Sequence, residues 1–173
     1  MSSLIPSGTL DNLKQRAVII QNIRHFFQQR NVLEVETPLL CTATVTDPYI
    51  ESIQATANQQ RLFLQTSPEY AMKRLIASGI GDCFQLCKAF RDDEQGHLHN
   101  NEFTMLEWYR LGFDHHQLMD EMDDLLQLVL NCPKASRLSY QQLFKKHLGI
   151  NPHDTSITQL ENIAKKHDAY DSI

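Results

Sequence analysis

The sequence has no long hydrophobic run, and none of its stretches approaches the roughly 20 apolar residues that a membrane span requires. Residues 1–9 lack the apolar core of a signal peptide. Cysteine is scarce, with four residues and no CxxC pair, which is typical of a protein kept in a reducing compartment. These absences argue against a secreted or membrane-spanning protein and predict a cytoplasmic one.

A long basic tract is also missing. The net charge is −5 with histidine neutral, and basic residues gather in nothing longer than Lys145-Lys146 or Lys165-Lys166-His167. Broad nucleic-acid binding depends on basic surface and on counterion release, so tRNA is not the expected partner. There is no internal repeat, and a composition with 42% hydrophobic residues predicts one ordinary globular core.

Two residue pairs could suggest a metal site. Cys83 and Cys87 fall in one expected strand, where residues four apart are separated by about 13 Å, too far to share zinc. His97 and His99 have no third nitrogen or sulfur ligand placed with them, and Mg²⁺ prefers oxygen ligands. We therefore expect the two cysteines to be core thiols, and no metal site in this chain.

Residues 82–110 predict a hairpin with a long loop. Asp82–Ala89 is mostly apolar or short-chained, as in a strand, and Glu102–Arg110 alternates between two faces. The connection between them is polar and charged, with Gly96 placed for a turn. One face of the second strand carries Phe103, Met105, Glu107 and Tyr109.

This hairpin suits chemistry on a phosphate beside a cationic amine. Arg91, at the end of the first strand, offers a planar fork of donors that matches phosphate oxygens. Glu107 offers a carboxylate to an ammonium group, a charge-assisted contact worth about 1.5–3 kcal/mol. From the pattern alone, the alternative is a surface hairpin whose Arg91 and Glu107 are merely solvated.

The segment before the hairpin begins with a predicted helix. Leu10–Arg30 places apolar side chains at steps of three and four, with Thr9 as a plausible N-cap. Val32–Glu36 is expected to form a short strand, Cys41–Gln60 a polar loop, and Arg61–Gln65 another strand.

Further helices are predicted on both sides of the hairpin. Ser67 is placed to cap the first of them, which Gly79 ends. Asp114–Leu130 is the clearest helix, with Asp114 as its cap. Its apolar stripe is expected at Leu118, Met122, Leu125 and Val129, and a solvated acidic face at Asp120, Glu121, Asp123 and Asp124. Two shorter helices are expected at Ser139–Leu148 and Ser156–His167.

The hairpin residues also carry a family resemblance. This stretch closely resembles motif 2 of the class II aminoacyl-tRNA synthetases, lysine branch. The resemblance rests on Phe90-Arg91, the acidic run after it, His99-Asn100, and Glu102 to Glu107. The ending Leu106-Glu107-Trp108-Tyr109 looks more like the elongation factor P–lysine ligases, which charge a lysine of a translation factor. Thr42–Asp47 resembles a run of the same ligases, and Leu10–Pro38 resembles motif 1, which builds the dimer interface in this family.

The resemblance implies an α+β fold, an antiparallel sheet flanked by helices. It implies that residues 1–133 hold motifs 1 and 2, and that 134–173 form a helical segment. No stretch after Tyr109 resembles motif 3 or the acidic residues that hold Mg²⁺. The fold is therefore expected to be incomplete, and the chain to be an inactive N-terminal portion.

The resemblance also implies site residues. Arg91 would be the catalytic residue that grips the α-phosphate of ATP, and the nucleotide would further contact Asp92, Asp93 and Asn100. Lysine or β-lysine would bind at Ser67, Pro68, Glu69, Glu107 and Tyr109. Asp92-Asp93 replaces the usual Asn-Glu, so the side chain of Asp93 is one methylene shorter than that of the usual Glu, and Glu94 is a substitute for it. Asn101 replaces a usual proline.

The implied function is activation of lysine or (R)-β-lysine with ATP and Mg²⁺, followed by transfer to a lysine of elongation factor P. Two alternatives stay open: a catalytic fragment of lysyl-tRNA synthetase, and a non-catalytic synthetase-like binding module. Only nine residues precede Leu10, which leaves no anticodon-binding barrel there and favours the ligase. The choice between α-lysine and β-lysine stays open.

Overall fold

The computed structural model describes residues 8–92, 96 and 99–167. The chain divides into two compact units, residues 1–132 and 133–173. In the first unit the elements are α1 (Leu10–Gln28), β1 (Leu33–Glu34), β2 (Leu40–Cys41), β3 (Gln54–Ala57), β4 (Gln60–Leu64), α2 (Glu69–Ala77), β5 (Cys83–Phe90), β6 (Glu102–Tyr109) and α3 (His115–Leu130). No helix within the described ranges is both long enough and apolar enough to cross a membrane.

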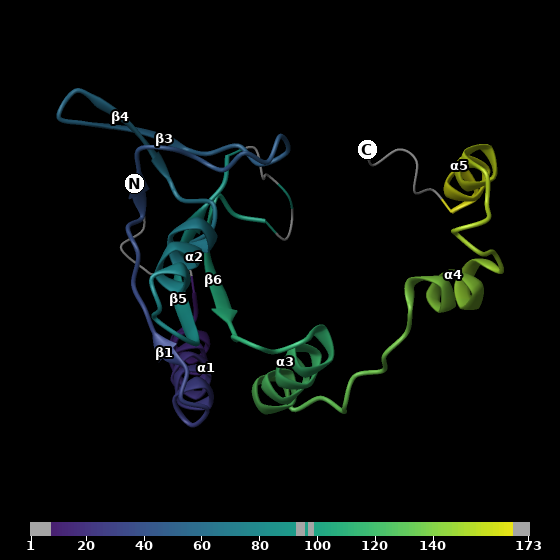
Figure 1. Ribbon diagram of the computed structural model, residues 1–173, viewed down its shortest axis with the longest axis horizontal. Coiled ribbons are helices and arrows are strands. Elements are labelled where there is room, and N and C mark those ends of the chain that lie inside the picture. Colours follow the sequence, from purple (N-terminus) through teal and green to yellow (C-terminus); the bar gives the residue numbers. More distant parts are fainter. Residues whose placement is uncertain (1–7, 93–95, 97–98, 168–173) are drawn as a thin grey trace. The chain divides into compact units, whose positions relative to one another are not determined.

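The predicted hairpin is confirmed as β5 and β6. The two strands pair antiparallel over their full length, from Cys83 opposite Tyr109 to Phe90 opposite Glu102 (Figure 1). β1 adds to the other edge of β5 in parallel, with Leu33 opposite Cys83. The sheet has the order β1-β5-β6 and is mixed, and together with the helices it makes the predicted α+β fold.

The helix predicted at the start of the chain is confirmed as α1. Thr9 caps it by accepting a hydrogen bond from the Asn12 amide at 3.2 Å. Asn31, with a positive φ of 55°, reverses the chain after its last turn. Only the end of its apolar face is buried, at Phe26 and Phe27, while Leu13 is exposed.

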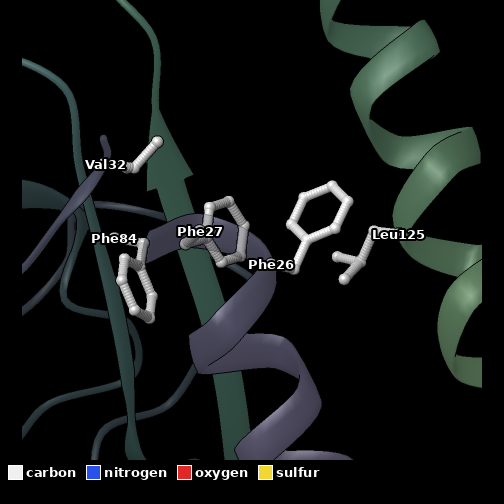
Figure 2. Packing of buried hydrophobic residues seen from close by; sticks show 5 residues of the cluster. All are labelled: Phe26, Phe27, Val32, Phe84 and Leu125. Atoms are coloured by element: carbon white, nitrogen blue, oxygen red, sulfur yellow. The ribbon is translucent and has the colours of Figure 1, made fainter. Parts of the chain in front are cut away.

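The core lies between α1 and one face of this sheet. The ring of Phe27 stacks on Phe84 of β5 with centroids 4.5 Å apart, and lies 5.5 Å from the ring of Trp108 on β6. Figure 2 shows Phe26 on the other side of Phe27, facing Leu125 of α3. Because side chains alternate along a strand, this packing leaves the other face of the hairpin to Gln85, Glu107 and their neighbours.

The polar loop predicted for Cys41–Gln60 is wrong. A second sheet of order β2-β4-β3 draws two of its strands from this region, β3 within it and β2 at its start. Asn58 and Gln59 both have positive φ and make the tight connection between β3 and β4. Gln54–Ala57 is short and has no large apolar side chain, so the sequence gives only a weak strand signal. Main-chain pairing with β4 orders it.

The prediction for α3 is correct in position and partly wrong in burial. Asp114 forms a capping box with Gln117, as a helix start requires. Leu118 and Met122 of the expected apolar stripe are exposed, whereas Glu121 and Asp123 of the expected solvated face are buried. The partners that make this burial possible come from elsewhere in the chain, so helical periodicity alone does not reveal them.

The second unit contains α4 (Tyr140–Leu148) and α5 (Ile157–Lys166). Ser139 and Ser156 cap them, each with a complete capping box. Both predicted helices are confirmed. Gly149, with φ of 70°, ends α4 in the left-handed conformation.

Of the two cysteines expected in the core, Cys83 is buried and Cys87 is half-buried. Burial raises the pKa of both thiols, which keeps them protonated. They share one face of β5, with Gln85 between them, because Cys83 lies opposite Tyr109 and Cys87 opposite Met105 in the ladder with β6.

Candidate functional site

The face of the hairpin that points away from α1 carries the candidate site. In the β5–β6 ladder Gln85 lies opposite Glu107, and Cys83 lies opposite Tyr109. Strand alternation therefore places the carboxylate and the phenol side by side, as the sequence predicts.

Two hydroxyl groups orient the carboxylate of Glu107. Ser67 Oγ donates to Oε2 at 2.7 Å, and the Tyr109 hydroxyl donates to Oε1 at 2.7 Å. Each oxygen thus has one fixed donor and keeps a further acceptor position. The arrangement holds an anion in one orientation at a partly buried position, which suits recognition of an ammonium group.

The segment before α2 brings Ser67 into this arrangement, in a way that differs from the prediction. Ser67 is not the N-cap: α2 begins at Glu69, and Pro68 is its cap without a side-chain hydrogen bond. Ser67 Oγ instead accepts from the Glu69 amide at 3.0 Å while it donates to Glu107. Pro68 is fully buried, and its ring restricts the backbone φ angle at this turn.

Tyr109 is held in its protonated form. Burial raises the pKa of its phenol well above the ordinary value, and the hydrogen bond to Glu107 and the charges of Glu107 and Glu69 raise it further. The hydroxyl therefore stays a donor to Glu107 at neutral pH.

Glu69 adds a second carboxylate to the site. It lies in the first turn of α2, about half exposed, and forms an ion pair with Lys73 one turn further along. Glu69 raises the pKa of Lys73 through this hydrogen bond, and the charge of Glu107 contributes in the same direction. Sequence reasoning missed Lys73, although a Glu–Lys spacing of four on a helix is a signal that could have found it.

Arg91 lies just beyond the end of β5, on the strand face that also carries Glu107. Its guanidinium carbon is 5.2 Å from the centre of the Phe103 ring, which holds the cation over an aromatic face. The Arg91 amide donates to the Asn101 carbonyl at 3.0 Å, and Asn101 Nδ2 donates to the Arg91 carbonyl at 2.8 Å. The asparagine that stands in place of a proline therefore clamps the base of the loop.

The other residues predicted to contact a nucleotide lie around this loop. Asp92 is exposed, and its amide donates to the Glu51 carbonyl at 2.9 Å. Asn100 is also exposed. Asp93 and Glu94 lie outside the described residues, as does His97 of the predicted histidine pair.

A small cavity borders the acidic end of the site. It has a volume of about 80 Å³ and is lined by Ser67, Glu69 and Tyr70 together with residues 43–45. The hydroxyls of Thr46 and Tyr70 lie 3.0 Å apart and hold the 42–47 segment against α2. The 42–47 segment, which resembles a run of the ligases, therefore lies beside residues that are predicted to bind the amino-acid substrate.

Gln85 is a further polar residue behind the site that sequence reasoning missed. It is buried, and its Oε1 accepts from Thr37 Oγ1 at 3.0 Å. No group of three potential metal ligands comes together within the described ranges. The described residues of the site are the carboxylates of Glu69 and Glu107 and the protonated phenol of Tyr109, and the guanidinium of Arg91 lies beyond the end of β5.

The family profile for class II tRNA synthetases of the D, K and N types matches residues 4–171. The chain belongs to this family, which confirms the resemblance drawn from motifs 1 and 2.

Curated relatives narrow the resemblance further. The chain is 53% identical over 167 residues to the elongation factor P–(R)-β-lysine ligase of Vibrio vulnificus, covering 93% of this chain and 52% of the relative. The ligase of the same name from Vibrio cholerae is 51% identical over 94% of this chain and 52% of its own length. That of Edwardsiella ictaluri is 50% identical over 97% and 54%. The chain thus spans about half the length of these relatives.

Proposed function

We propose that this chain provides the amino-acid pocket and the α-phosphate contact of an ATP-dependent ligase. The ligase activates lysine or (R)-β-lysine and transfers it to a lysine of elongation factor P. The observation that carries the proposal is the carboxylate of Glu107, held by Ser67 and Tyr109 on the sheet face that also carries Arg91. The names of the relatives support the acceptor protein and the amino acid.

The pocket matches a diamino acid in charge. Glu69 and Glu107 are two anions, and lysine and β-lysine each carry two ammonium groups. Phe103, beneath Arg91, and Glu107 lie four residues apart on β6, a separation of about 13 Å along an extended strand. One extended substrate can therefore place an ammonium group at Glu107 and direct its carboxylate toward the Arg91 end.

Arg91 acts on the phosphate at which the bond changes take place. The substrate carboxylate attacks the α-phosphorus of ATP, the bond to pyrophosphate breaks, and an aminoacyl-adenylate forms. The ε-amine of the acceptor lysine then attacks the acyl carbon, loses a proton and releases AMP. The guanidinium stabilises the charge that develops on the phosphoryl oxygens, and a single lost donor of this kind costs about 2.7–4 kcal/mol. Positioning and electrostatics supply the catalysis, without a covalent nucleophile of the protein.

Four further features belong to the proposal. ATP would contact Arg91, Asp92, Asp93 and Asn100, and Mg²⁺ would be needed for the pyrophosphate leaving group. α1 and β1 would form a homodimer interface, and the protein would act in the cytoplasm. Because these 173 residues show no motif 3, we expect them alone to bind the amino acid and not to complete adenylation.

ATP–pyrophosphate exchange with α-lysine and (R)-β-lysine in parallel tests the activity. We expect no exchange from the 173 residues and Arg91-dependent exchange when the chain is extended to the length of its relatives. If the 173 residues catalyse Arg91-dependent exchange, the expectation about the missing motif 3 is wrong. If the extended protein gives no exchange with either amino acid, the proposed activity itself is wrong.

Two alternative functions have distinct signatures. A lysyl-tRNA synthetase fragment fits the family profile, and tight, salt-sensitive binding of tRNA in a gel shift would favour it. A non-catalytic binding module would bind lysine or ATP stoichiometrically in calorimetry, while the extended protein would give no exchange. The net charge of −5 argues against the tRNA-binding alternative.

A further inference from the structure

We propose that Lys73 competes with the ammonium group of the substrate for the carboxylate of Glu69. This competition sets the affinity of the pocket for cationic amino acids. In the free protein the ammonium group of Lys73 already donates a hydrogen bond to the carboxylate of Glu69. The inference rests on the proposed function of Glu69 and Glu107 as an ammonium pocket, and it assigns a role to a residue outside the predicted set.

The fold places Lys73 at the pocket for a simple reason. Glu69 and Lys73 are four residues apart on α2 and so lie on the same side of the helix, one turn from each other. The Glu69 amide is tied to Ser67 Oγ, and Ser67 is tied to Glu107, so the start of α2 is fixed against β6. The residue whose carboxylate Lys73 binds is therefore linked to Glu107 through its main-chain amide and the Ser67 hydroxyl.

The pair is open enough to exchange partners. The side chains of Lys73 and Glu69 are 55% and 45% exposed, so a ligand can reach the carboxylate and the lysine can move into water. A lysine stem has several rotatable bonds and an ammonium group that is readily hydrated. Glu107 and Tyr70 also raise the pKa of Lys73, which indicates that its charge lies within the electrostatic field of the whole site.

The ammonium group of an incoming substrate is chemically equivalent to that of Lys73. Both are hydrated cations that donate to a carboxylate oxygen, and they repel each other when they share Glu69. Binding therefore requires Lys73 either to leave or to remain close to a like charge. The alternative is an ordinary exposed ion pair that supports α2 and has no effect on ligand affinity.

The size of the effect follows from general magnitudes. An exposed helix pair at this spacing changes an equilibrium constant about two-fold. A like charge about 4 Å away in water changes one roughly five-fold. Replacing Lys73 with a neutral residue of similar length should tighten lysine binding by between about two-fold and about ten-fold.

Calorimetric titration of the 173-residue protein with lysine and with (R)-β-lysine tests the proposal on Lys73→Met. The matched control is Lys88→Met. Lys88 also forms an exposed ion pair, with Glu102 at 2.8 Å, but strand alternation places it on the face of the hairpin that α1 covers. We expect tighter binding in Lys73→Met alone, a gain that shrinks as salt is raised, and wild-type affinity in Lys73→Arg, which restores the charge.

Equal affinities in wild type, Lys73→Met and Lys88→Met would overturn the inference and leave the pocket intact. Weaker binding in Lys73→Met would also overturn it, because Lys73 would then position Glu69 for the ligand. If neither wild type nor Lys73→Met binds lysine or β-lysine, the proposed pocket itself fails. Thermal unfolding of each variant shows whether a change in affinity reflects a loss of folded protein.

Discussion

Glu121 and Asp124 lie nearly one turn apart on α3 and both form ion pairs with Arg30, yet their removal should have very different consequences. Glu121 is 5% exposed, lies 3.4 Å from Arg110 Nε and accepts from the Trp108 indole at 3.0 Å. Asp124 is 59% exposed and lies 3.1 Å from Arg30 Nη2. The comparison separates a buried charge from a surface charge on one helix.

The expected magnitudes follow from this burial. Glu121→Ala leaves Arg110, itself 11% exposed, with Asp82 at 3.0 Å as its remaining ion pair among those described, and removes the acceptor of the indole. Breaking a buried ion pair costs about 3–5 kcal/mol. Asp124→Ala removes an exposed pair that is worth about 0–1 kcal/mol. Glu121→Gln keeps an acceptor for Trp108 without the charge and should fall between the two.

Urea unfolding followed by fluorescence measures these differences. Trp108 is the only tryptophan of the sequence and lies within the network, so its emission reports on this unit directly. The reasoning would be refuted if Glu121→Ala and Asp124→Ala lost the same free energy of unfolding, or if Asp124→Ala lost more.

Three other predictions follow from the core and the site. Phe27→Ala should lose about 3–5 kcal/mol in urea unfolding, whereas Val18→Ala, at an exposed position of the same helix, should change it by about 0.5 kcal/mol or less; similar losses would mean that Phe27 is not the centre of the core. Glu107→Gln should weaken lysine binding about 10- to 100-fold in calorimetry with little change in the unfolding midpoint, and unchanged affinity would remove Glu107 from the pocket. The pKa of Tyr109 is higher in the folded than in the unfolded chain, so its contribution to stability is complete below about pH 10 and is lost as pH rises beyond it. The free energy of unfolding should therefore fall less between about pH 9 and about pH 11 in Tyr109→Phe than in wild type, and equal falls would contradict the burial of this phenol.

Strand alternation and helix capping are local rules, and they predict those features that depend only on neighbouring residues. Alternation along β6 is enough to place Glu107 and Tyr109 on one face, because a strand has a period of two. Capping residues likewise locate the starts of α3, α4 and α5, because each cap satisfies amides within its own first turn.

What the sequence could not predict depends on partners far along the chain. The hydrogen bond from Ser67 to Glu107 joins residues 40 positions apart, and it removes Ser67 from the capping role that local rules assign. Glu121 is buried because Trp108 and Arg110 reach it from β6 and the residue after it. Propensity does not carry this information, since it treats an acidic residue on a helix as solvated until a partner is known.

The same reasoning explains the missed second sheet. Gln54–Ala57 is only four residues long, with Thr56 as its one β-branched residue and no large apolar side chain, so it does not stand out as a strand. Its order comes from pairing with β4 through a tight turn at Asn58 and Gln59. The 42–47 segment, which leads from β2 toward β3, lies beside α2, so the part of the fold that was hardest to predict also borders the candidate pocket.

The most direct test of the central claim is calorimetric titration of the 173-residue protein with lysine, (R)-β-lysine and norleucine, which lacks the side-chain ammonium group. The account predicts stoichiometric binding of lysine or β-lysine and binding of norleucine that is weaker by at least about ten-fold, the value of one charge-assisted contact. Equal binding of lysine and norleucine, or no binding of any of the three, would contradict the assignment of Glu69, Glu107 and Tyr109 to an ammonium pocket.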